Sequence, residues 1–80
     1  MIYATKFTIM RWLQIGKREG ATHMLLVEDV LAEENVPVYV SANEKLNYKI
    51  KRFDDAHSMR INAVFDLFVD LEQQLNSFYR

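Results

Sequence analysis

The first apolar positions of the chain are spaced as on the buried face of a helix. Between Thr8 and Glu19 they recur at helical intervals, at Ile9, Trp12 and Leu13. Thr8 is a suitable N-cap, and a start near Thr5 is the alternative. Gly20 follows, and glycine is favoured in the left-handed position that ends a helix. We therefore expect a first helix over residues 8–19.

The next apolar positions are continuous, which indicates strands. The segment from Ala21 to Val30 contains Met24, Leu25, Leu26 and Val27 in succession, and the segment from Val36 to Val40 is rich in β-branched and aromatic residues. The link from Leu31 to Asn35 suits an antiparallel hairpin and is too short for a parallel crossover. Pro37 cannot donate to a ladder, so we expect its strand at an edge of the sheet.

Two further helices are predicted after the hairpin. Ser41 and Glu44 have the spacing of a capping box, so we expect a helix to begin there. Its apolar stripe is Leu46, Ile50 and Phe53, and the pair Asp54-Asp55 marks its end. From about Asp55 to Phe78, apolar residues alternate spacings of three and four, in an a/d heptad pattern formed by Ile61, Val64, Phe68, Leu71, Leu75 and Phe78.

This heptad pattern leads to expectations about burial and self-association. Phe68 and Leu71 should face inward, whereas Asp70 and Glu72 should be solvated. The apolar surface of such a helix is wider than a hairpin can cover, so we expect it to pair with a second copy of the chain. The residues expected to form that self-association surface are Ile61, Val64, Phe68, Leu71 and Leu75.

These elements predict one α+β domain over residues 1–80: a helix, an antiparallel β-hairpin and two helices, the last one long and packed on the sheet. A two-stranded sheet is marginally stable alone. Either residues Met1 to Lys6 contribute a third strand, or a homodimer completes the burial. We favour the homodimer.

Composition excludes several classes of protein. Ten basic residues against eleven acidic ones give a net charge of −1, so nucleic-acid binding is disfavoured. The chain has no cysteine, which excludes a disulfide scaffold and a thiolate zinc site. No uncharged stretch approaches the roughly 20 residues of a membrane helix, and no signal peptide is recognisable. We expect a soluble, cytoplasmic protein with no membrane partner.

Catalytic chemistry has little support in the sequence. His23 and Asp29 would share one face of an extended strand, but about 20 Å apart, because each residue adds roughly 3.3 Å. His23 is therefore expected to be structural, with one backbone hydrogen bond, and a role in catalysis or metal binding is the alternative. His57 lies in a helix-capping segment. We expect no catalytic residue, no metal site and no cofactor.

Two charged segments are candidate contact surfaces. Four carboxylates surround the hairpin turn, at Glu28, Asp29, Glu33 and Glu34. They are either solvated surface or a face that contacts a basic partner. The segment from Lys45 to Arg52 is basic and contains Tyr48, which is compatible with a solvated helix face or with nucleic-acid stacking.

Several stretches resemble a group of small uncharacterised proteins encoded by bacteriophages. The resemblance is carried by Gly20-Ala21-Thr22-His23-Met24, Asp29, Pro37-Val38-Tyr39-Val40 and parts of the segment from Met59 to Leu75. It covers about two thirds of the chain and departs from the group between Leu31 and Asn35.

This resemblance implies a non-enzymatic phage accessory protein in the cytoplasm of the host. Such a protein is expected to bind and inhibit a host factor, such as a CRISPR–Cas or other defence complex. The alternatives are a homo-oligomeric structural or assembly protein of the phage and a small enzyme or metal-binding protein that uses His23.

Overall fold

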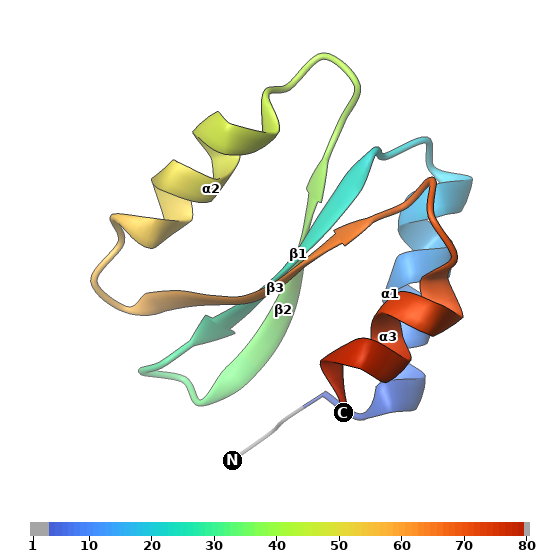
Figure 1. Cartoon of the computed structure of the whole chain (residues 1–80). Helices are drawn as coiled ribbons and strands as arrows, with labels where there is room; N and C mark the ends of the chain where they lie inside the picture. Colours follow the sequence, from blue (N-terminus) through green and yellow to red (C-terminus); the bar gives the residue numbers. More distant parts are fainter. Residues whose placement is uncertain (1–3, 80) are drawn as a thin grey trace.

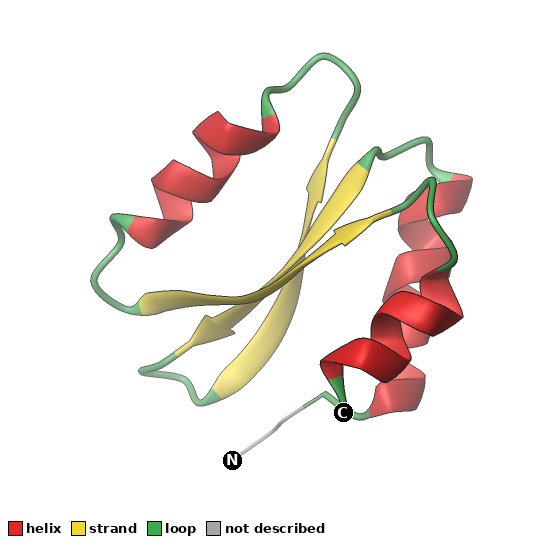
Figure 2. Ribbon diagram, in the orientation of Figure 1, coloured by secondary structure: helices red, strands yellow, loops and turns green. Residues whose placement is uncertain are grey.

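The computed structural model describes residues 4–79 and shows a three-stranded antiparallel sheet between two layers of helices (Figure 1). The strand order is β2-β1-β3, so the central strand is β1. Helices α1 and α3 cover one face of the sheet and α2 covers the other (Figure 2). In chain order the elements are α1 (Lys6–Arg18), β1 (His23–Asp29), β2 (Glu34–Val40), α2 (Leu46–Asp54), β3 (Met59–Asp66) and α3 (Leu71–Phe78).

Helix α1 begins earlier than the Thr8 cap predicts. Its N-cap is Thr5, whose side-chain oxygen accepts a hydrogen bond from the Thr8 N–H at 3.2 Å. The alternative start near Thr5 is therefore correct, and it adds a first turn to the helix. Gly20 follows the helix with φ at 84°, which confirms the left-handed termination expected of this glycine.

The predicted hairpin is confirmed. Strands β1 and β2 pair antiparallel over seven residues each, from His23↔Val40 to Asp29↔Glu34. Strand β2 lies at an edge of the sheet, as Pro37 predicts. The turn is closed by the Asp29 carboxylate, which accepts hydrogen bonds from the N–H groups of Leu31 and Ala32, both at 3.1 Å.

The predicted long helix is wrong. Its first half forms strand β3, which pairs antiparallel with β1, and only eight residues form α3. The register of β3 shifts by one residue opposite Leu26 and Val27, because Asn62 is inserted there as a bulge. The bulge places Ile61 and Val64 on the same face of the strand although they are three residues apart, and this spacing imitates a helix.

The third strand is therefore Met59–Asp66 and does not come from the N-terminus. Residues 1–3 of the predicted strand Met1 to Lys6 lie outside the described residues, and Lys6 is the first residue of α1. Within the described chain, each face of the sheet packs against its own helices, and neither face requires a second copy for its cover.

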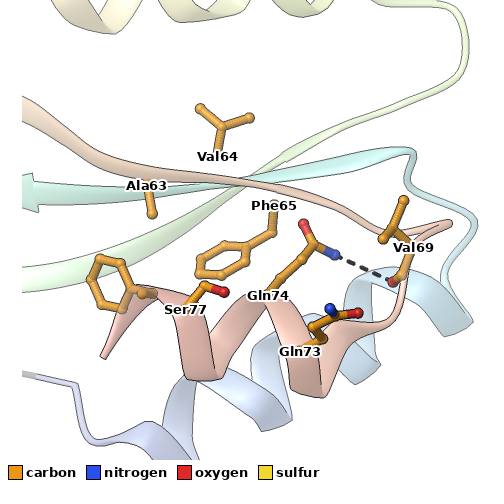
Figure 3. Close-up of a pocket in the computed structure, with 8 residues that line it drawn as sticks. Ala63, Val64, Phe65, Val69, Gln73, Gln74 and Ser77 are labelled. Atoms are coloured by element: carbon orange, nitrogen blue, oxygen red, sulfur yellow. Dashed lines mark hydrogen bonds between the residues drawn. The ribbon is translucent and has the colours of Figure 1, made fainter. Parts of the chain in front are cut away.

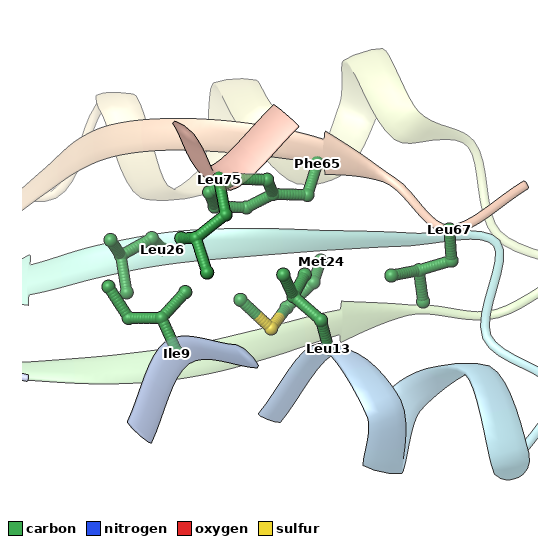
Figure 4. Packing of buried hydrophobic residues seen from close by; sticks show 7 residues of the cluster. All are labelled: Ile9, Leu13, Met24, Leu26, Phe65, Leu67 and Leu75. Atoms are coloured by element: carbon green, nitrogen blue, oxygen red, sulfur yellow. The ribbon is translucent and has the colours of Figure 1, made fainter. Parts of the chain in front are cut away.

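The two faces of the sheet form two separate hydrophobic cores. The first joins α1, α3 and the sheet through Ile9, Leu13, Met24, Leu26, Phe65, Leu67 and Leu75 (Figure 4). The second lies under α2 and contains Leu25, Val27 and Val40, with Leu46, Ile50 and Phe53 packed against them. The predicted apolar stripe of α2 is thus confirmed.

Helix α2 starts later than its capping box predicts. The Glu44 carboxylate accepts hydrogen bonds from the Ser41 N–H at 3.0 Å and the Ser41 hydroxyl at 2.9 Å, but the helix begins at Leu46. Glu44 also pairs with Lys49 at 2.7 Å. Lys49 first, and then the two Ser41 groups, lower the pKa of Glu44 from 4.5 to about 2.

Candidate partner-binding groove

The two edges of the sheet differ in how open they are. Strand β2 carries Pro37 in its ladder, and proline removes one N–H from the edge. Strand β3 contains no proline, and its side away from β1, here called the outer edge, is next to α3. The outer edge of β3 is therefore the candidate site for an additional strand.

Gln74 shows the hydrogen-bonding direction of this edge. Its side-chain amide oxygen accepts from the Asp66 N–H at 2.9 Å, and its Nε2 donates to the Asp66 carbonyl at 2.7 Å. Asp66 thus presents both backbone groups away from β1. Because these directions alternate along a strand, the N–H and carbonyl of Val64 also point outward.

A groove of about 510 Å³ lies between the outer edge of β3 and α3, and we call it the β3 groove. Its lining residues are Ala63, Val64, Phe65, Val69, Gln73, Gln74, Ser77 and Phe78. In Figure 3, Ala63 and Phe65 point from β3 towards α3, whereas Val64 points away from the helix. The groove is open to solvent, with Val69 50% and Phe78 38% exposed.

The floor of the groove is aromatic and its rim is polar. Phe65 is buried, and its ring meets that of Phe78 edge to face, with 6.0 Å between centroids. Phe78 in turn contacts Tyr79, whose hydroxyl donates to the Ala4 carbonyl at 3.4 Å and whose pKa is raised by burial. Within the described residues, the side chains of Gln73 and Ser77 make no hydrogen bond, so their polar groups are open to a ligand.

The four carboxylates of the hairpin do not form one equivalent surface. Asp29 closes the turn, and Glu28 accepts a hydrogen bond from the Asn62 side chain at 3.3 Å. Glu33 is exposed in the turn with φ at 56°, and Glu34 is half-buried at the start of β2. At the centre of the turn, Leu31 is 85% exposed.

The residues predicted for self-association are divided among three segments. Ile61 and Val64 lie in β3, Phe68 lies in the β3–α3 turn and is 78% exposed, and Leu71 begins α3. Leu75 is fully buried in the first core. These side chains share no continuous helical face, so the homodimer stays a prediction without the surface expected for it.

Phe68 corrects a further expectation about this segment, and Asp70 has a role that was not expected. Phe68 does not face inward, because the turn directs it to solvent, while Leu71 is half-buried. Asp70 and Glu72 are exposed, as expected, but the Asp70 carboxylate is also the N-cap of α3 and accepts from the Gln73 N–H at 3.1 Å. The spacing Asp70-x-x-Gln73 is that of a capping box and could have located the start of α3.

His23 is half-buried at the start of β1, and its Nδ1 lies 3.0 Å from the Thr22 hydroxyl. The observed partner is therefore a side chain and not the backbone group expected for it. Among residues 4–79, no three His, Asp or Glu side chains are grouped so that they could hold a metal ion.

No protein-family model, curated protein or solved structure matches the chain. Within the described residues, none of the helices has the length and apolar character needed to span a membrane.

Proposed function

We propose that this chain is a non-enzymatic binding protein that takes an extended segment of a partner protein along the outer edge of β3. The observation that carries the proposal is the pairing of the Gln74 amide with both backbone groups of Asp66. This amide bonds to the edge as a peptide group of another strand would. A partner segment would continue the same pattern at Val64.

The β3 groove supplies a place for side chains of the partner. An apolar side chain fits between Val69 and Phe78, which are both partly exposed, above the buried ring of Phe65. Gln73 and Ser77 offer hydrogen bonds at the rim. Backbone bonds would give affinity in this arrangement, and the apolar contact would give specificity.

We further propose that the partner is a protein of the bacterial host, such as a component of a defence complex. The resemblance to small phage proteins supports this choice. A partner from the phage particle is the alternative, since an assembly protein would also act through a contact surface.

Affinity capture from infected host cells, with matched variants, tests the proposal. Val69→Asp places a charge in the groove and should lower recovery of the specific partner at least tenfold. Phe7→Asp is the control, because Phe7 is also an exposed apolar residue, at 79%, but lies on α1, outside the β3 groove. Equal recovery by both variants and the unmodified chain would contradict binding in the β3 groove.

Overlapping peptides of the captured protein then test the strand-addition mode. One extended peptide with an apolar residue should compete for binding, and proline at alternate positions of that peptide should abolish competition, because proline removes ladder hydrogen bonds. Competition only by a folded domain, with no active peptide, would show that the partner does not add a strand.

A further inference from the structure

Two short segments of the chain carry opposite charges in equal number. Residues 28–34, here called the hairpin tip, contain four carboxylates and no basic residue. Residues 45–52 contain four basic residues and no acidic one. The net charge of the whole chain is only −1, so these two segments are an acidic and a basic region of a nearly neutral chain.

The basic segment is presented on the outside of α2. Leu46, Ile50 and Phe53 pack on the sheet, which leaves Tyr48 on the opposite side, 76% exposed. Three shallow hollows meet at Tyr48, and their lining includes Lys45, Lys49, Lys51 and Arg52. We call the surface formed by Lys45, Tyr48, Lys51 and Arg52 the basic face of α2.

The hairpin tip presents exposed apolar side chains next to acidic ones. Its centre is Leu31, which projects into solvent with 85% of its surface exposed, and Glu33 next to it is also exposed. The tip is held in shape by the two hydrogen bonds from the turn amides to Asp29 and by the Val30 N–H, which donates to the Ser58 carbonyl at 2.8 Å. The tip thus combines the exposed side chains of Leu31 and Val30 with carboxylates. The basic face combines the ring of Tyr48 with Lys45, Lys51 and Arg52, and the carboxylates of Glu44 and Asp55 lie at the margins of its hollows.

The two surfaces do not neutralise each other within one chain. In the described residues the only ion pair is Lys49 with Glu44, and Glu44 belongs to neither segment. The hydrogen bond between Val30 and Ser58 places the tip beside the loop that follows α2 (Figure 1), so the C-terminal end of α2, which carries Lys51 and Arg52, lies towards the same end of the molecule as the tip, whereas Lys45 lies at the other end of the helix. A two-fold axis at this end would let each tip meet the α2 of the other copy.

We infer that two copies of this chain associate with the hairpin tip of each on the basic face of α2 of the other. Leu31 lies against Tyr48 in this contact, while Glu33 and Glu34 face Lys45, Lys51 and Arg52. The opposite charges steer the encounter and fix the orientation, and the apolar pair excludes water at the centre. The contact uses no residue of the β3 groove, so it is independent of the proposed function.

A charge-exchange experiment by analytical ultracentrifugation tests this dimer. The tip variant is Glu33→Lys with Glu34→Lys, which spares Asp29 and its turn. The helix variant is Lys45→Glu with Lys51→Glu. Each variant alone brings like charges together in both contacts, so its dimer dissociation constant should rise at least tenfold.

An equimolar mixture of the two variants should recover the dimer. In the mixed pair, one contact joins a basic tip to an acidic α2, and the other joins the two unmodified surfaces. The variant pair Arg11→Glu with Lys17→Glu, on the exposed side of α1, changes the net charge equally and should leave the dimer intact. Raising the salt above about 0.15 M should weaken association of the unmodified chain.

Three results would overturn the inference. The first is an unmodified chain that stays monomeric at low salt. The second is that both charge variants dimerise as strongly as the unmodified chain. The third is that the equimolar mixture of the two variants does not form a dimer. Titration with a single-stranded oligonucleotide tests the alternative that the basic face of α2 binds nucleic acid. Binding lost in the helix variant and kept in the tip variant, with a monomeric unmodified chain, would identify the basic face as a nucleic-acid surface instead.

Discussion

Gln74 connects the outer edge of β3 to helix α3. Its amide bonds to both backbone groups of Asp66, and its Nε2 also lies 3.3 Å from the Val69 carbonyl (Figure 3). One side chain thus joins α3, the β3–α3 turn and the strand. Buried polar groups are tolerated only when they form hydrogen bonds. Removal of the Gln74 amide would leave the partly buried N–H and carbonyl of Asp66 without a partner.

Gln74→Ala should lower the free energy of unfolding by about 1–3 kcal/mol, because two part-buried backbone bonds are lost. Gln73→Ala is the matched control: its side chain makes no hydrogen bond in the described chain, and the loss should stay within about 0.5 kcal/mol. Urea denaturation of both variants measures the difference. Equal stability of the two variants would show that Gln74 does not hold the edge.

Two phenylalanines three residues apart should respond in opposite ways to truncation. Phe65 is 2% exposed in the first core, so Phe65→Ala should cost about 3–5 kcal/mol. Phe68 is 78% exposed, so Phe68→Ala should cost no more than about 0.5 kcal/mol. Thermal and urea unfolding report both values. A larger loss of stability for Phe68→Ala than for Phe65→Ala would support the long heptad helix predicted from the sequence and contradict the structure.

The Glu44 carboxylate gives the fold a pH dependence of known sign. Its pKa is lowered to about 2 in the folded chain, chiefly by Lys49, so folding favours the ionised form. The resulting stability is complete above the ordinary pKa of 4.5 and is lost as the pH falls towards 2. Glu44→Gln should therefore be less stable than the unmodified chain at pH 7, and the gap should narrow by pH 3. A gap that is constant with pH would contradict an ionic role.

At the scale of the elements, local patterns predict α1, the hairpin and the buried stripe of α2. Each of these segments has a single period of apolar residues, and its neighbours in the sequence supply its first contacts. The sequence does not reveal β3 because the Asn62 bulge disturbs its period of two, and Ile61, Val64 and Phe68 then follow one another at spacings of three and four, as on a helix. Pairing with β1, thirty or more residues away, decides its conformation.

The packing of α1 on the sheet depends on a close approach at Gly16. A Cβ atom at this position would lie 2.6 Å from a ring carbon of Tyr39 and 3.0 Å from the Leu67 side chain. The Tyr39 hydroxyl donates to the Trp12 carbonyl at 2.8 Å, which holds the ring against the helix.

Gly16→Ala should therefore destabilise the fold by about 1–3 kcal/mol through overpacking, despite the higher helix propensity of alanine. Gln14→Ala, on the exposed side of the same helix, should be close to neutral. Chemical denaturation compares the two. A stabilising Gly16→Ala would mean that α1 can move away from Tyr39 without loss.

At the scale of the whole molecule, the candidate groove is a product of the tertiary fold. Its walls come from β3, the following turn and α3, which the sequence pattern merges into one helix. The charged segments, in contrast, are visible in the sequence, because they are local. The structure shows where these charges lie, at the hairpin tip and on α2. The residues that line the β3 groove are uncharged.

Amide hydrogen exchange at Val64, measured by NMR with and without the captured partner, tests the central claim most directly. In the free protein the outward N–H of Val64 should exchange rapidly, whereas the amides of the central strand β1 are protected. On binding, exchange at Val64 should slow at least a hundredfold, because the partner strand supplies the missing acceptor. Rapid exchange at Val64 in a saturated complex, with protection elsewhere on the surface, would contradict strand addition at β3.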